Sequence, residues 1–184
     1  MRMRRTAACA AAWMALWTAG AWAEEAAAGP EKTSLGGIER VHRMGPCYIA
    51  SQPGEGDFQK IREAGVKSVV NVRAAGEVTA FDEKKVVEGL GMAYANPGFT
   101  PDTLDDAAFD AALAALHGAD KPVLLHCSSA NRAGAVWLVH RALDDGLSYE
   151  DALAEARAVG LTHPGLEAKA KAYVEARKKA EKAE

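Results

Sequence analysis

The sequence predicts a three-layer α/β/α sandwich with a mostly parallel β-sheet. Short apolar runs alternate with longer segments of helical periodicity, and Gly or Pro residues separate them. Nearly continuous apolar strands are typical of parallel sheets that helices cover on both faces. Ligands bind such sheets beyond the carboxyl ends of the strands. This rule selects four places for a site, which are residues 51–52, Arg73, residues 96–100 and residues 127–132.

Five segments fit strands. Residues 66–73 are rich in Val, as expected for a buried parallel strand, and residues 122–127 are expected to form the central strand. Residues 38–44 are expected at an edge of the sheet, with a Gly45-Pro46 turn after them. The expected strands are residues 38–44, 47–51, 66–73, 92–96 and 122–127.

Six segments fit helices, because their apolar residues recur at spacings of three and four. Gly65 and Gly160 end two of them, as Gly often does. Residues 163–165, His-Pro-Gly, are expected to break the chain before the last helix. The expected helices are residues 57–64, 80–90, 103–117, 131–143, 148–160 and 166–184.

Residues 1–23 are expected to be a secretory signal peptide. They begin with three Arg residues, continue with an apolar run of small residues, and end in the cleavage pattern Ala21-Trp22-Ala23. An uncleaved membrane anchor is the alternative, although the apolar run is short for a spanning helix. Cleavage after Ala23 would give an exported protein, periplasmic or secreted, with no stable membrane association.

The rest of the chain is expected to hold one domain. Residues 24–37 are interpreted as a flexible lead-in, residues 38–165 as the catalytic domain, and residues 166–184 as a charged helix packed on it or extending from it. Loss of the three Arg residues of the signal peptide would change the net charge from −3 to −6. Nucleic acid is therefore not an expected partner, and an anion site has to be made by local amides and a few Arg residues.

Residues 122–134 hold the most informative pattern. An apolar run ends in His126-Cys127, and Arg132 follows at what looks like the start of a helix. A buried strand would deliver Cys127 to its carboxyl end, where the next helix start directs backbone N–H groups. These N–H groups and a nearby cation favour the nucleophilic thiolate. The pattern predicts a tetrahedral anion held beside Cys127.

Each residue of this segment has an expected role. Arg132 is expected to bind an oxyanion through two N–H groups. His126 is expected to shape the loop through hydrogen bonds and to help set the pKa of the thiolate. It is not expected to act as the base, because neighbouring side chains on a strand point apart. Asn131 is expected in a left-handed conformation. The backbone N–H groups of the anion-binding loop belong to Ser128, Ser129, Ala130, Asn131 and Ala133.

The segment resembles the His-Cys-x5-Arg-Ser/Thr loop of the Cys-dependent tyrosine and dual-specificity phosphatases. The phosphatase-like domain of the beta-lactamase-hydrolase-like proteins is the most similar subfamily. The similarity continues in residues 48–53 and 69–77 and covers most of residues 38–145. It implies a dual-specificity-phosphatase-like fold and hydrolysis of phosphomonoesters through a phosphocysteine at Cys127.

The resemblance also implies a general acid on the loop after the preceding strand. Asp102 is the best placed candidate, and Asp105 and Asp106 are weaker ones. Capping of the next helix is the alternative role for all three. Arg73 is expected to support the site, either by binding the anion or by pairing with Glu77.

The loop departs from the phosphatase pattern in three ways. Only four residues separate Cys127 from Arg132, Ala133 replaces the usual Ser or Thr, and Ala130 replaces the usual Gly. Four is also the rhodanese spacing, so a sulfurtransferase with a persulfide on Cys127 is the alternative function. An anion-binding module without activity is a third hypothesis. The expected substrate is a small anion, either a phosphoester or a sulfane-sulfur donor, and a thiol reductant would be a partner.

The second Cys of the predicted mature chain is Cys47. An oxidising compartment favours disulfides, but a bond between Cys47 and Cys127 would consume the nucleophile. Cys47 is interpreted as a strand residue, and a regulatory pair with Cys127 is the alternative, which needs Cα atoms within about 7 Å. No metal or cofactor is expected. The other four His residues follow no pattern and are interpreted as structural or solvated: His42, His117, His140 and His163.

Overall fold

The computed structural model describes residues 29–77 and 80–183, so the expected signal peptide lies outside the described residues. These residues contain a six-stranded sheet in the order β1-β2-β3-β6-β4-β5. β3, β6, β4 and β5 run parallel, whereas β1 and β2 pair with antiparallel neighbours. The strands are β1 (Glu31–Lys32), β2 (Val41–Met44), β3 (Cys47–Ala50), β4 (Ser68–Asn71), β5 (Ala93–Ala95) and β6 (Val123–His126).

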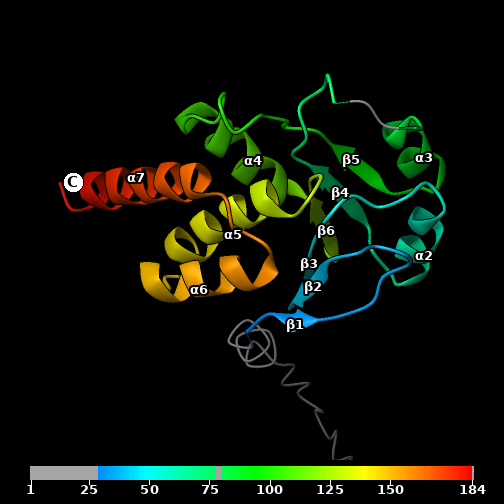
Figure 1. The fold of residues 1–184 in the computed structure, drawn as a ribbon, viewed down its shortest axis with the longest axis horizontal. Helices are drawn as coiled ribbons and strands as arrows, with labels where there is room; N and C mark the ends of the chain where they lie inside the picture. The colour runs from blue at the N-terminus through cyan, green and yellow to red at the C-terminus, as the bar shows by residue number, and fades with distance from the viewer. Residues whose placement is uncertain (1–28, 78–79, 184) are drawn as a thin grey trace, which may run out of the picture.

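Helices lie on both faces of the sheet, which confirms the predicted three-layer sandwich (Figure 1). One face carries α2 and α3, and the other carries α4, α5, α6 and α7. Within the described part of the chain, no helix is long and apolar enough to cross a membrane. The helices are α2 (Asp57–Glu63), α3 (Glu83–Gly89), α4 (Asp106–Gly118), α5 (Asn131–Leu143), α6 (Tyr149–Val159) and α7 (Pro164–Glu181).

The central strands are buried on both faces. Val69 of β4 and Leu124 of β6 pack in one cluster with Phe58 of α2. The next residues along these strands, Val70 and Leu125, belong to the cluster beneath α4, α5, α6 and α7. Because strand side chains alternate between faces, two apolar faces require an unbroken apolar run. This explains why residues 122–127 could be predicted as the central strand.

The first two strands differ from the prediction. The expected edge strand at residues 38–44 forms only over β2, and β1 lies outside it at the edge. β1 falls within residues 24–37, the expected flexible lead-in. Glu31 pairs with Arg43, and Lys32 pairs with His42. Both β1 residues are exposed, so the strand depends on backbone pairing and has no apolar pattern that sequence analysis could detect.

Two helices begin later than predicted, because an Asp residue caps each of them. α3 was expected from residue 80, but Asp82 accepts a hydrogen bond from Lys85 N at 3.1 Å and sets the start at the next residue. α4 was expected from residue 103, but Asp105 accepts from Ala108 N at 2.8 Å. Side-chain capping of the first free N–H groups thus fixes both starts.

The last helix begins earlier than predicted. Residues 163–165 were expected to be a break, but they are the start of α7. Pro164 occupies the first turn, where a helix does not need the missing N–H. His163 is the N-cap, and its Nδ1 accepts from Leu166 N at 3.3 Å. The predicted boundary between residues 165 and 166 therefore falls inside a helix.

Candidate active site

Cys127 follows directly after β6, at the carboxyl edge of the sheet. Its N–H donates to Ala50 O at 3.3 Å, and the preceding His126 O accepts from Val72 N at 3.0 Å. These bonds come from the chain on both sides of β6 and hold the start of the loop. The Cys127 side chain is completely buried. The sheet therefore places Cys127 where the topology predicts a ligand.

The loop turns sharply at Ala130. This residue has φ 69° and is the N-cap of α5, so it adopts the left-handed conformation that was expected of Asn131. Asn131 is instead the first helical residue, and its Oδ1 accepts from Thr162 N at 2.7 Å and His163 N at 2.8 Å. A left-handed Ala costs about 1 kcal/mol or more. The loop thus makes a left-handed turn at Ala130, where the family resemblance would place Gly.

The start of α5 leaves N–H groups free of intrahelical acceptors. Gly134 N, which donates to Ala130 O at 2.8 Å, makes the first bond of the helix. The N–H groups of Asn131, Arg132 and Ala133 come before it, and the positive end of the helix dipole lies at this point. This arrangement suits an anion beside Cys127, as predicted from the sequence.

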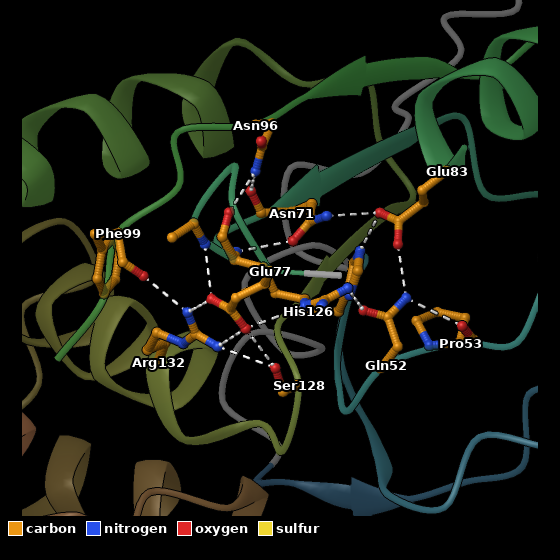
Figure 2. Close-up of polar contacts among 12 residues, drawn as sticks. Gln52, Pro53, Asn71, Glu77, Glu83, Asn96, Phe99, His126, Ser128 and Arg132 are labelled. Carbon is orange, nitrogen blue, oxygen red and sulfur yellow. Dashed lines mark hydrogen bonds and ion pairs between the residues drawn. The ribbon is translucent and has the colours of Figure 1, made fainter. Parts of the chain in front are cut away.

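Arg132 lies in the first turn of α5 and is buried. Its Nη1 donates to Phe99 O at 2.8 Å and to Glu77 Oε1, and its Nη2 donates to Glu77 Oε2 at 2.9 Å (Figure 2). Nη2 also reaches Ser128 Oγ at 3.0 Å. The hydrogen bonds that Arg132 donates to Glu77 raise the pKa of Arg132, and the neighbouring Cys127 adds to this effect. The guanidinium is therefore a fixed cation beside Cys127.

Glu77 is the residue of this site that sequence analysis missed. Besides Arg132, its carboxylate accepts from Ser128 Oγ at 2.9 Å and from Ala74 N at 2.9 Å. The hydrogen bond from Arg132 is the largest cause that lowers the pKa of Glu77 to about 2. The sequence offered Glu77 only as a partner for Arg73, because nothing in the spacing shows that residues 77 and 132 meet.

Arg73 lies beside this pair rather than in the loop itself. Its Nε is 3.3 Å from Glu77 Oε2, and its Nη1 donates to Gln52 Oε1 at 2.7 Å. The expected pairing of Arg73 with Glu77 is therefore present. Gly98 lies so close that a Cβ on it would be 2.0 Å from Arg73 O, and only Gly fits there. The backbone of residues 73 and 98 thus forms one tight support for the site.

His126 points away from Cys127, as predicted, and into a buried polar network on the other face of the sheet. Its Nε2 lies 2.9 Å from Glu83 Oε1, and Asn71 Nδ2 donates to the same oxygen at 2.8 Å (Figure 2). Gln52 Nε2 donates to Glu83 Oε2 at 2.6 Å. Burial would raise the pKa of Glu83, but the hydrogen bond and charge of His126 bring it below its ordinary value. The network joins the last residues of β4 and β6 to the segment after β3 and to the start of α3.

Asp102 lies in the turn between Phe99, which binds Arg132, and α4. Its side chain is exposed, and its backbone O accepts from Lys169 Nζ at 3.0 Å. Of the three candidate acids, Asp105 is the one that caps α4. Capping is therefore not the role of Asp102, which remains the candidate for the general acid.

Cys47 is too far from Cys127 to form a disulfide with it. β3 and β6 run parallel, with Cys47 opposite Val123. Cys127 lies four residues beyond Val123, which corresponds to about 13 Å along the strand. A disulfide needs Cα atoms within about 7 Å. Both thiols are free and buried, and burial raises the pKa of Cys47, so this residue is structural.

No family model matches this chain. A curated relative, the beta-lactamase hydrolase-like protein of Agrobacterium fabrum, is 32% identical over 110 residues, which are 56% of this chain and 25% of the relative. The chain thus spans about a quarter of the length of this relative.

Two solved structures show the fold. P. aeruginosa TpbA has a TM-score of 0.61 at 23% identity, over 82% of this chain and 91% of that one. The core catalytic domain of the PP-IP phosphatase SIW14 from S. cerevisiae has a TM-score of 0.62 at 21% identity, over 77% and 87%. The chain has the fold of the Cys-dependent tyrosine-phosphatase-like proteins. We call the segment from Cys127 to Arg132, which follows the central strand of this fold, the phosphatase-like loop.

Proposed function

We propose that this chain is a Cys-dependent phosphatase of the tyrosine and dual-specificity type, which hydrolyses phosphomonoesters through Cys127. The loop geometry is the observation that supports this best. Cys127 ends the central strand, and Arg132 lies in the first turn of α5 with the loop amides between them. TpbA has been solved with pTyr and SIW14 with citrate, which supports a small anionic substrate.

The proposed reaction has two steps. The Cys127 thiolate attacks phosphorus, the bond to the leaving oxygen breaks, and protonated Asp102 gives its proton to that oxygen. Water then attacks the phosphocysteine while Asp102 takes up a proton, and inorganic phosphate leaves as the thiolate is restored. The loop amides and Arg132 stabilise the negative charge on the phosphoryl oxygens in both steps.

Glu77 has a positioning role in this proposal. It binds both terminal nitrogens of Arg132 and the hydroxyl of Ser128, so it fixes the guanidinium and the first turn of the loop together. A fixed guanidinium needs no rearrangement when charge develops in the transition state. The Ser128 hydroxyl thus contributes to the site, in addition to the backbone N–H expected of this residue.

We propose further that residues 1–23 direct export of the protein and are removed after Ala23. The basic start, the apolar run and the Ala-x-Ala pattern support this. A thiol reductant would then keep Cys127 reduced in the periplasm. The intact mass of protein recovered from the periplasmic fraction tests the proposal, which requires Glu24 as the first residue.

The phosphatase proposal is tested by turnover of an aryl phosphate across about pH 5–8, an interval that lies between the ordinary pKa values of carboxyl and thiol groups. Cys127→Ser is expected to abolish turnover, and the matched Cys47→Ser variant is expected to retain it. The sulfurtransferase alternative, which the relatives do not support, is tested by intact mass after exposure to thiosulfate. A gain of one sulfur on Cys127 without phosphate release would replace the proposal by that alternative.

A further inference from the structure

His117, His140 and Asp144 form a cluster away from the phosphatase-like loop. One ligand atom from each residue lies within 4.8 Å of the other two. His117 Nε2 and His140 Nδ1 each lie 2.8 Å from Asp144 Oδ2. His140 and Asp144 are one turn apart, and His117 comes from the last turn of α4. Two helices therefore direct three ligand groups to one point.

The cluster is separate from the proposed catalytic site. α5 begins at Asn131, next to the loop, and His140 lies nine residues further on, about 13 Å along the helix axis. Neither His140 nor His117 contacts a residue of the loop through any hydrogen bond found in the described chain. The three residues thus have no part in the phosphatase reaction proposed above.

We propose that His117, His140 and Asp144 bind a divalent transition-metal ion of the zinc type. Two imidazole nitrogens and one carboxylate are ligands that Zn²⁺ takes, whereas Ca²⁺ and Mg²⁺ take oxygen ligands. Bonds of about 2.1 Å in a tetrahedron separate the ligand atoms by roughly 3.4 Å. The present 2.8 Å separations need to widen only slightly, and the side chains of His117 and Asp144 are exposed enough to move. Water would complete the tetrahedron.

A second carboxylate supports this proposal. His140 Nε2, the ring nitrogen that faces away from the three-ligand centre, lies 3.6 Å from Asp145 Oδ2. Arg141 Nη1 binds the same oxygen at 2.8 Å and holds Asp145 in place. Metal-bound His residues commonly direct their second ring nitrogen to a carboxylate, which orients the ring. The Trp137 ring also packs against His140, with 5.1 Å between ring centroids.

A bound ion would connect the carboxyl-terminal ends of α4 and α5. The amino-terminal end of α5 contacts the segment before α4 at the candidate active site, where Arg132 of α5 donates to Phe99 O. An ion that binds only the folded chain stabilises it as the ion concentration rises. The melting temperature is therefore expected to increase with Zn²⁺ concentration.

Isothermal titration calorimetry of tag-free protein with Zn²⁺ tests the site, because it measures the affinity and the number of ions bound per chain. A Cys127→Ser background removes the thiolate that could itself bind zinc. One ion per chain is expected. His117→Gln and Asp144→Asn should each weaken binding by at least about tenfold, the loss that even outer-shell changes cause. His163→Asn is the matched control, because Asn also caps helices and this imidazole lies outside the cluster.

Two outcomes would overturn the proposal. One is the absence of binding to the unsubstituted cluster, and the other is equal binding by the cluster variants and the His163→Asn control. Circular dichroism checks that each variant is folded. A measurement that needs no variant is modification of His117 by diethyl pyrocarbonate, which Zn²⁺ should suppress. Unchanged modification of His117 at saturating Zn²⁺ would also contradict the site.

Discussion

Glu77 and Arg132 are 55 residues apart in the chain and form a bidentate ion pair beside the loop of Cys127, with each carboxylate oxygen bound to one terminal guanidinium nitrogen. The pair fixes the guanidinium before any anion binds. An anion in the loop has to share Arg132 with the carboxylate of Glu77. Glu77 can therefore assist catalysis by positioning Arg132, or it can compete with the substrate for Arg132. The two roles predict opposite effects of a Glu77 substitution on kcat/KM.

Glu77→Gln is expected to lower kcat/KM for an aryl phosphate about tenfold, which equals about 1.4 kcal/mol of transition-state stabilisation. The amide retains the shape of the side chain but loses the charge that holds both nitrogens of Arg132. Steady-state kinetics measure the effect, with the exposed Glu88→Gln as the control. A rise in kcat/KM would instead show that Glu77 competes with the substrate.

Acid is expected to weaken the fold through Glu77. Its pKa is about 2 in the folded protein and has an ordinary value of 4.5. Because the folded value is the lower one, the pair contributes stability above pH 4.5, and this contribution is lost as the pH falls toward 2. Urea unfolding between these pH values should show a steeper loss for the natural protein than for Glu77→Gln. Equal slopes would contradict the assignment.

Asp102→Asn is expected to lower kcat by about 10²-fold or more, because an amide cannot protonate the leaving oxygen. The loss should be larger for substrates with more basic leaving groups. Asp105→Asn is the matched control, since Asn caps α4 as well as Asp does. Similar activities of the two variants would show that Asp102 is not the acid.

Glu83→Gln is expected to cost about 3 kcal/mol of unfolding free energy. Gln52, Asn71 and His126 all donate to this buried carboxylate. The amide of Gln would place another donor against one of them. Urea denaturation measures the loss, and Glu88→Gln on the same helix should change stability by less than about 1 kcal/mol. A stability equal to that of the control would show that the network is dispensable.

Two free thiols are expected in residues 24–184 after exposure to air, because Cys47 and Cys127 lie about 13 Å apart along parallel strands. Thiol titration of the unfolded chain measures them. Loss of both thiols without a gain in molecular size would mean that the two residues pair within one chain, against the structure.

The sequence alone determined the three-layer architecture and the place of Cys127 after the central strand. The buried run at residues 122–127 could only be a central strand, and the helix after it had to start beside Cys127. Local rules of strand burial and helix termini suffice for this, because they involve residues near one another in the chain. The same rules failed at β1, where exposed residues pair through the backbone alone.

Only the tertiary structure decided which distant side chains meet. Glu77 reaches Arg132, Glu83 reaches His126, and Asp144, directly after α5, reaches His117 of α4. The left-handed residue, which was predicted to be Asn131, is Ala130 in the structure. Such contacts depend on the register of strands and the packing of helices, which bring together residues whose separation in the chain follows no period. Their identities therefore leave no local pattern in the sequence.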